Sequence, residues 1–75
     1  MTKHDLLEHL ADVGTADAMN VADRFGITYA AAAMALLRLN RQSLVHRYLD
    51  AEDGLYFYEL SERGHVRLAF FRNHR

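Results

Sequence analysis

The stretch from Asp17 to Leu39, DAMNVADRFGITYAAAAMALLRL, has the pattern of two short helices joined by a tight turn. Asp17 can cap the first helix by accepting a backbone N–H, and Thr28 can cap the second helix in the same way. Between them, Gly26 supplies the positive-φ residue that ends the first helix. This combination of caps and a glycine-centred turn predicts a helix-turn-helix.

A further helix precedes this motif. Its predicted N-terminus has Thr2 and Asp5 in the spacing of a capping box, and Gly14 follows its last turn. Thr15 and Ala16, between this helix and the motif, are expected to form a short strand. The first three helices are therefore predicted at Lys3–Val13, Ala18–Phe25 and Tyr29–Gln42.

A hairpin pattern follows the motif. Two runs rich in β-branched and aromatic residues, Leu44–Leu49 and Leu55–Leu60, are separated by Ala51-Glu52-Asp53-Gly54, and a last helix is predicted from Glu62. The loop could contain two or four residues, and its length decides which face Tyr48, Tyr56, Phe57 and Tyr58 take. The order helix, helix, helix, hairpin, helix predicts a mainly α member of the α+β class. This is a winged helix-turn-helix, with a three-helix core, a hairpin wing and a C-terminal helix, formed by residues 1–75 as a single domain.

Three runs resemble winged-helix transcription regulators of the MarR and PadR type. They are NVADRFGIT at residues 20–28, LVHR at 44–47 and YELSERG at 58–64, and the resemblance covers nearly the whole chain. It implies the winged fold and a homodimer whose interface is formed by terminal helices. It also implies a regulator that binds double-stranded DNA.

Composition and charge limit the partners. The chain has a net charge of −1, no cysteine and no proline. Its second half holds seven of the nine basic residues, which favours a nucleic-acid contact there. The arginines of the last helix are expected to be Arg63, Arg67, Arg72 and Arg75. The longest apolar run, Tyr29–Leu37, is far short of the ~20 residues that span a bilayer. We expect a cytoplasmic protein that has no membrane partner.

The helix at 29–42 carries the candidate DNA-binding site. Its core stripe is expected to be Ala32, Ala35, Leu36 and Leu39, so Met34 and Leu37 should be largely exposed on the opposite face. Small residues there would let the helix lie deep in the major groove, against thymine methyl groups, while neighbouring residues hold phosphates. The candidate DNA-binding residues are Thr28, Tyr29, Ala30, Ala33, Met34, Leu37, Arg38, Arg41 and Arg47.

Two other interpretations of this face stay open. An exposed apolar helix face is also suited to a protein partner, which makes a winged-helix protein-interaction module the alternative function. The alanines could also simply stabilise a short helix. The hairpin tip favours neither phosphate contact nor entry into a minor groove, because it carries Asp50, Glu52 and Asp53.

The remaining patterns point away from catalysis and cofactors. His4 and His9 are about 140° apart around a helix and cannot form a zinc pair. No triad or paired carboxylates stand out, and we expect neither an enzyme, a metal nor a cofactor. Phe70 and Phe71 lie about 100° apart on the last helix, so one should pack inside and the other should be exposed. This pair is the candidate dimer interface.

Overall fold

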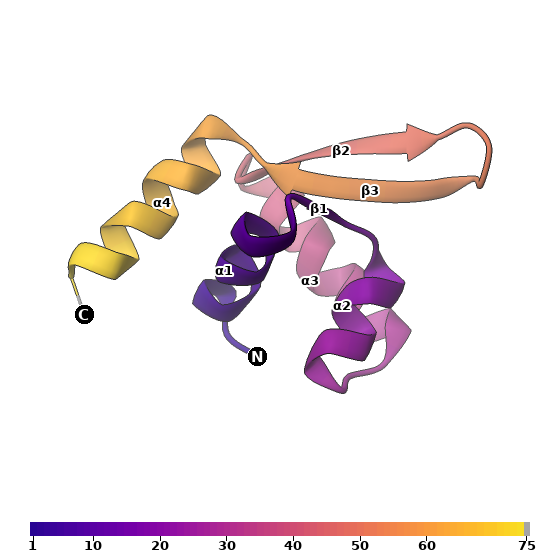
Figure 1. Cartoon of the computed structure of the whole chain (residues 1–75), viewed down its shortest axis with the longest axis horizontal. Helices are drawn as coiled ribbons and strands as arrows, with labels where there is room; N and C mark the ends of the chain where they lie inside the picture. The colour runs from indigo at the N-terminus through magenta and orange to yellow at the C-terminus, as the bar shows by residue number, and fades with distance from the viewer. Residues whose placement is uncertain (75) are drawn as a thin grey trace.

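Four helices and a three-stranded antiparallel sheet make up the computed structural model, which describes residues 1–74 (Figure 1). The elements are α1 (Lys3–Val13), β1 (Thr15–Ala16), α2 (Ala18–Phe25), α3 (Tyr29–Arg41), β2 (Val45–Asp50), β3 (Leu55–Leu60) and α4 (Glu62–Asn73). The predicted winged helix-turn-helix is confirmed, while Arg75, assigned to the last helix, lies outside the described residues. Within residues 1–74, no helix has both the length and the apolarity needed to cross a membrane.

Helix boundaries follow the capping residues closely. At the start of α1, the Thr2 hydroxyl accepts the Asp5 N–H at 3.1 Å and the Asp5 carboxylate accepts the Thr2 N–H at 2.8 Å, which confirms the capping box. α2, α3 and α4 have side-chain N-caps at Asp17, Thr28 and Ser61. These caps satisfy backbone donors that have no partner within the helix.

The sheet has the order β1-β3-β2, so β2 is an outer strand. Pairing of Asp50 with Leu55 leaves a loop of four residues, 51–54, and this settles the loop length that the sequence left open. Tyr56 and the buried Tyr58 lie on one face of the hairpin. Tyr48 and Phe57 are paired across the strands on the other face, where their rings stack at 6.3 Å.

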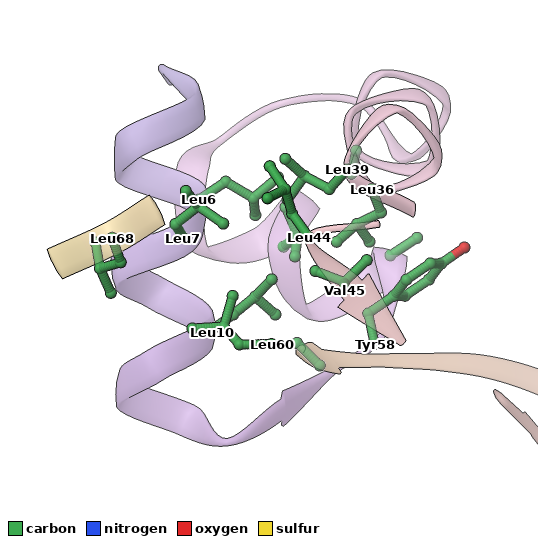
Figure 2. Close-up of a cluster of buried hydrophobic side chains, with 14 of the residues drawn as sticks. Leu6, Leu7, Leu10, Leu36, Leu39, Leu44, Val45, Tyr58, Leu60 and Leu68 are labelled. Carbon is green, nitrogen blue, oxygen red and sulfur yellow. The ribbon is translucent and has the colours of Figure 1, made fainter. Parts of the chain in front are cut away.

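Leucines from α1, α3 and α4 meet in one core (Figure 2). Leu6, Leu7 and Leu10 of α1 and Leu36 of α3 are fully buried, as is Leu68 of α4. The stripe predicted for α3 is confirmed, with Ala35 partly buried at its margin, and Ala11 of α1 is partly buried as well. In Figure 1, α4 and the hairpin project from this core in opposite directions.

The ends of α3 and β2 differ by one residue from the sequence prediction. α3 ends at Arg41, and Ser43 then takes a positive φ of 61°. Leu44 does not join the strand, because its N–H donates to the Leu39 carbonyl at 3.0 Å and its carbonyl accepts the Ser61 N–H at 3.0 Å. The chain therefore turns through Ser43 and Leu44 before the ladder begins at Val45.

Leu44, Ser61 and Gly64 form a close junction that joins α4 to the base of the hairpin. The Ser61 hydroxyl donates to the Ser43 carbonyl at 2.7 Å and accepts the Gly64 N–H at 3.0 Å. Gly64 is buried, and a methyl group at this position would overlap the Leu44 carbonyl oxygen. The absence of a side chain at Gly64 lets α4 begin this close to the chain leaving α3.

An ion pair joins α4 to α1 on the far side of the core. Arg72 donates to the two carboxylate oxygens of Glu8, from Nε at 3.0 Å and from Nη2 at 2.7 Å, and His4 lies 3.1 Å from the same carboxylate. These hydrogen bonds, chiefly those from Arg72, lower the pKa of Glu8 to about 2.

We predict that Gly64→Ala destabilises the protein. Alanine normally stabilises a helix interior relative to glycine by up to ~1 kcal/mol. Here the added methyl group meets a backbone carbonyl, and overpacking of this kind costs ~1–3 kcal/mol. Thermal unfolding should show a lower Tm for Gly64→Ala. Arg67→Ala, at an exposed site of the same helix, should leave Tm nearly unchanged. A higher Tm for Gly64→Ala would contradict the close approach.

The Glu8–Arg72 pair predicts a specific acid sensitivity. Because the pKa of Glu8 in the folded protein is below its ordinary value of 4.5, the stabilisation is complete above pH 4.5 and is lost as the pH falls towards about 2. Glu8→Gln should remove this contribution. The free energy of unfolding, measured between pH 6 and pH 2, should therefore fall less steeply with decreasing pH than it does in the wild type. Glu52→Gln, in the hairpin loop, is the matched control and should follow the wild-type curve.

Candidate functional site

The α2–turn–α3 unit is held by backbone geometry at its turn. Gly26 ends α2 in the left-handed conformation at φ 64°, and the Ile27 N–H donates to the Ala22 carbonyl at 3.1 Å. Ala22 is buried where the two helices approach each other. The helix-turn-helix predicted from the sequence is therefore present, with α3 as its second helix.

The outer face of α3, opposite its buried stripe, is open to solvent over most of its length. Tyr29 is 53% exposed and Met34 is 46% exposed, and the side chains of Ala30, Arg38 and Arg41 are exposed as well. Thr28 precedes them, and its hydroxyl accepts the Ala31 N–H at 3.1 Å. Most residues assigned to this face from the sequence thus share one accessible surface.

Two members of the set are less exposed than expected. Ala33 is partly buried and packs against the core, and Leu37, predicted to be largely exposed, is also only partly accessible. Side chains three and four positions apart on a helix cover one another, and Met34 and Arg41 have this spacing from Leu37. The accessible part of the face is therefore centred on Tyr29, Ala30 and Met34.

The arginines near α3 have no carboxylate partner among residues 1–74. The ion pairs in that part of the chain join Glu8 to His4 and to Arg72. Arg38 and Arg41 extend from the last turns of α3, and Arg47 is on β2. The guanidinium of Arg47 lies over the ring of Tyr56, 4.2 Å from its centroid. Cationic groups without an intramolecular acid are available to bind phosphate.

The hairpin loop carries negative charge, as the sequence indicated. The Asp50 carboxylate accepts the N–H groups of Glu52 at 2.9 Å and Asp53 at 3.4 Å, which shapes the turn. Sequence reasoning did not place Tyr56 and Tyr58 on the face that Arg47 shares, since this depends on the loop length.

The two histidines of α1, His4 and His9, have structural partners. His9 is buried, lies 2.7 Å from the Asn20 side chain and meets Phe25 edge to face, so it joins α1 to α2. His4 lies beside Glu8 and the ring of Phe71. In the described part of the chain, no three histidine or acidic side chains gather to hold a metal ion.

The two phenylalanines of α4 take different environments, as predicted. Phe71 is partly buried and packs against the core, whereas Phe70 is 51% exposed. Val66, one turn before Phe70, is also exposed. α4 therefore presents an apolar strip to solvent next to its core-facing stripe.

Several solved structures are similar to the chain over nearly its full length. A MepR-like protein complexed with pseudoligands is 27% identical, with a TM-score of 0.90 over 97% of this chain and 52% of its own. A mutant of MepR from S. aureus bound to an oligodeoxyribonucleotide is 23% identical, with a TM-score of 0.86 over 95% of this chain and 54% of its own. A mutant of MarR from E. coli complexed with operator DNA is 14% identical, with a TM-score of 0.87 over 95% of this chain and 51% of its own.

These similarities confirm the resemblance to MarR-type winged-helix regulators that the sequence indicated. The chain spans about half the length of the solved structures that it matches. No protein-family model matches it, and no curated protein sequence matches it.

Proposed function

We propose that this chain is a transcription regulator that binds specific sequences of double-stranded DNA as a homodimer, with residues 1–75 acting as one domain in the cytoplasm and without catalytic activity. The observation that carries the proposal is the open outer face of α3, with arginines beside it that form no ion pair within residues 1–74. The similarity to MarR-type proteins solved with DNA supports the same function.

In this proposal, α3 enters the major groove with its apolar face against the bases. Ala30, Ala33 and Met34 contact thymine methyl groups, and the small alanines allow a close approach of the helix backbone. Leu37 lies near the sugar-phosphate backbone, where its partly covered side chain contributes apolar contact. Such a surface favours A·T-rich sequence, because the thymine methyl group is the apolar feature of the major groove.

Phosphate contacts hold the helix in this position. Arg38, Arg41 and Arg47 provide charge, and the hydroxyl groups of Thr28 and Tyr29 can each donate to a phosphate oxygen. The Thr28 oxygen accepts a backbone N–H as a cap, which leaves its own proton free to donate. The acidic loop at 51–54 contributes no phosphate contact in this proposal, because its carboxylates repel phosphate.

A second copy compensates for the small positive surface of one domain. Two α3 helices bound to half-sites one turn apart double the contact area, and linkage makes the second binding event intramolecular. The exposed strip of Phe70 and Val66 on α4 is the proposed contact between copies, with Phe71 supporting it from the core side. The rings of Phe70 and Phe71 meet edge to face, with 6.2 Å between their centroids.

Met34→Glu tests the DNA-binding face. Met34 is exposed, so the substitution should leave Tm nearly unchanged, while the new carboxylate faces DNA and should abolish duplex binding through like-charge repulsion. Thermal melts and a duplex titration measure the two effects. Val13→Glu, at an exposed site of α1, introduces the same charge and should retain binding.

Wild-type binding should also weaken with salt. Three arginine–phosphate contacts per domain, and therefore six in the dimer, predict a slope of about −5.4 in the log affinity of the dimer against log salt concentration. A folded Met34→Glu protein that keeps duplex binding would refute the role of α3. If this variant instead lost capture of a protein partner, and the wild type bound no duplex, the outer face of α3 would be a protein-interaction surface.

Phe70→Asp tests the homodimer. Phe70 points outward, so the substitution should give a folded monomer, which light scattering and a thermal melt can establish together. His65→Asp, at another exposed position of α4, is the control and should leave the dimer intact. A wild-type protein that stays monomeric at high concentration would rule out this interface.

A further inference from the structure

The two faces of the hairpin differ in charge. Successive residues of a strand alternate between faces, and residues paired across the strands share a face. What we call the inner face holds Val45, Arg47, Leu49, Tyr56, Tyr58 and Leu60. Figure 2 shows Tyr58 and Leu60 among the buried side chains, so this face is turned towards the helices. The acids of the strands, Asp50 and Glu59, lie on the opposite face. Of the strand residues that the structure describes, Arg47 is therefore the one charged member of the inner face.

The guanidinium of Arg47 contacts an aromatic ring and not an acid. Tyr56 is diagonal to Arg47 on the inner face, at a separation that long side chains can cross. The Arg47 Cζ lies 4.2 Å from the centroid of the Tyr56 ring, well inside the ~6 Å limit of a cation–π contact. Tyr58, directly opposite Arg47, is buried, whereas Tyr56 is 46% exposed and Arg47 is exposed as well. The contact is therefore open to an approaching partner.

A guanidinium held by a ring keeps its hydrogen-bond donors available. An ion pair with a carboxylate would occupy these donors, but within residues 1–74 Arg47 forms no ion pair. Its N–H groups can therefore bind a phosphate through two parallel hydrogen bonds. A side chain that is already held over a ring also has less rotamer freedom to lose on binding. The Tyr56 ring thus prepares Arg47 for an anion without competing for it.

Tyr56 lies next to the surface that is proposed to bind DNA. It lines one groove together with Tyr29 and Ala33 of α3. Both of these α3 residues belong to the candidate DNA-binding set, whereas Tyr56 does not. Contact with Tyr56 therefore keeps the charge of Arg47 beside the N-terminal half of α3.

We propose that Tyr56 is a positioning residue for DNA binding. Its ring holds the Arg47 guanidinium in the orientation in which the guanidinium binds a phosphate of the duplex. This role rests on the proposed function. It requires the ring of Tyr56 and the charge of Arg47 together, and it does not use the Tyr56 hydroxyl.

A double-mutant cycle of duplex binding tests whether the two residues act together. Tyr56→Leu should weaken the affinity of the dimer about tenfold, because each of two arginines loses a ring contact worth about threefold. Arg47→Ala should weaken it more and should reduce the size of the salt slope by about 1.8, because two phosphate contacts are lost. In the Arg47→Ala background, Tyr56→Leu should have little further effect. An equal loss in both backgrounds would overturn the proposal, because Tyr56 would then act without Arg47.

Two further variants separate the ring from the hydroxyl and from the hairpin as a whole. Tyr56→Phe keeps the ring and should bind duplex like the wild type. A loss as large as that of Tyr56→Leu would instead indicate a hydrogen bond from the hydroxyl to DNA and would overturn the proposal. Tyr48→Leu is the matched control, because Tyr48 is 43% exposed and lies on the opposite face of the hairpin. It should keep wild-type affinity, and thermal melts should show that every variant is folded.

A measurement without DNA distinguishes failure of this role from failure of the proposed function. In NMR spectra of the free protein, the ring current of Tyr56 should shift the Arg47 Nε–H resonance upfield, in the wild type and in Tyr56→Phe but not in Tyr56→Leu. Absence of this shift would refute the positioning role. The shift without any duplex binding would refute the proposed function, and with it the role in DNA binding. Duplex binding by the wild type that is equally tight in Tyr56→Leu would refute the positioning role alone.

Discussion

The close contact between Gly64 and the Leu44 carbonyl is the constraint on which the rest of the fold depends. It brings the start of α4 against the chain leaving α3, and Ser61 closes the junction by bonding to both Ser43 and Gly64. From this point the hairpin extends in one direction and α4 in the other (Figure 1). The junction thus places the proposed DNA surface and the proposed dimer surface on different parts of one rigid core.

Local signals were enough to predict the element order. The helix caps and the turn glycine contact only residues that are close in the sequence. The roles of Asp17, Thr28 and Gly26 can therefore be deduced without knowing the fold. The positive φ of Ser43 could not be predicted, because it is stabilised by a hydrogen bond to the Ser61 hydroxyl, 18 residues away. A non-glycine residue in this conformation depends on such long-range support.

The candidate site was only partly predictable. Helical periodicity placed Met34 correctly on the accessible face of α3, because exposure there depends mainly on angle around the helix axis. The same rule overestimated the exposure of Leu37, since it ignores coverage by neighbouring long side chains. The face on which Tyr56 and Tyr58 lie could not be predicted, because it depends on whether the hairpin loop has two or four residues.

The position of β2 at the edge of the sheet has a consequence for solubility. Its outer row of N–H and C=O groups is a template on which the hairpin of another molecule could add as a further strand. Parallel edge-to-edge stacking of two identical hairpins would bring their acidic tips, with Asp50, Glu52 and Asp53, close together. The resulting repulsion opposes growth of the sheet into an aggregate. The charges that make the hairpin tip unsuited to phosphate therefore also protect the exposed edge of β2 from pairing with another molecule.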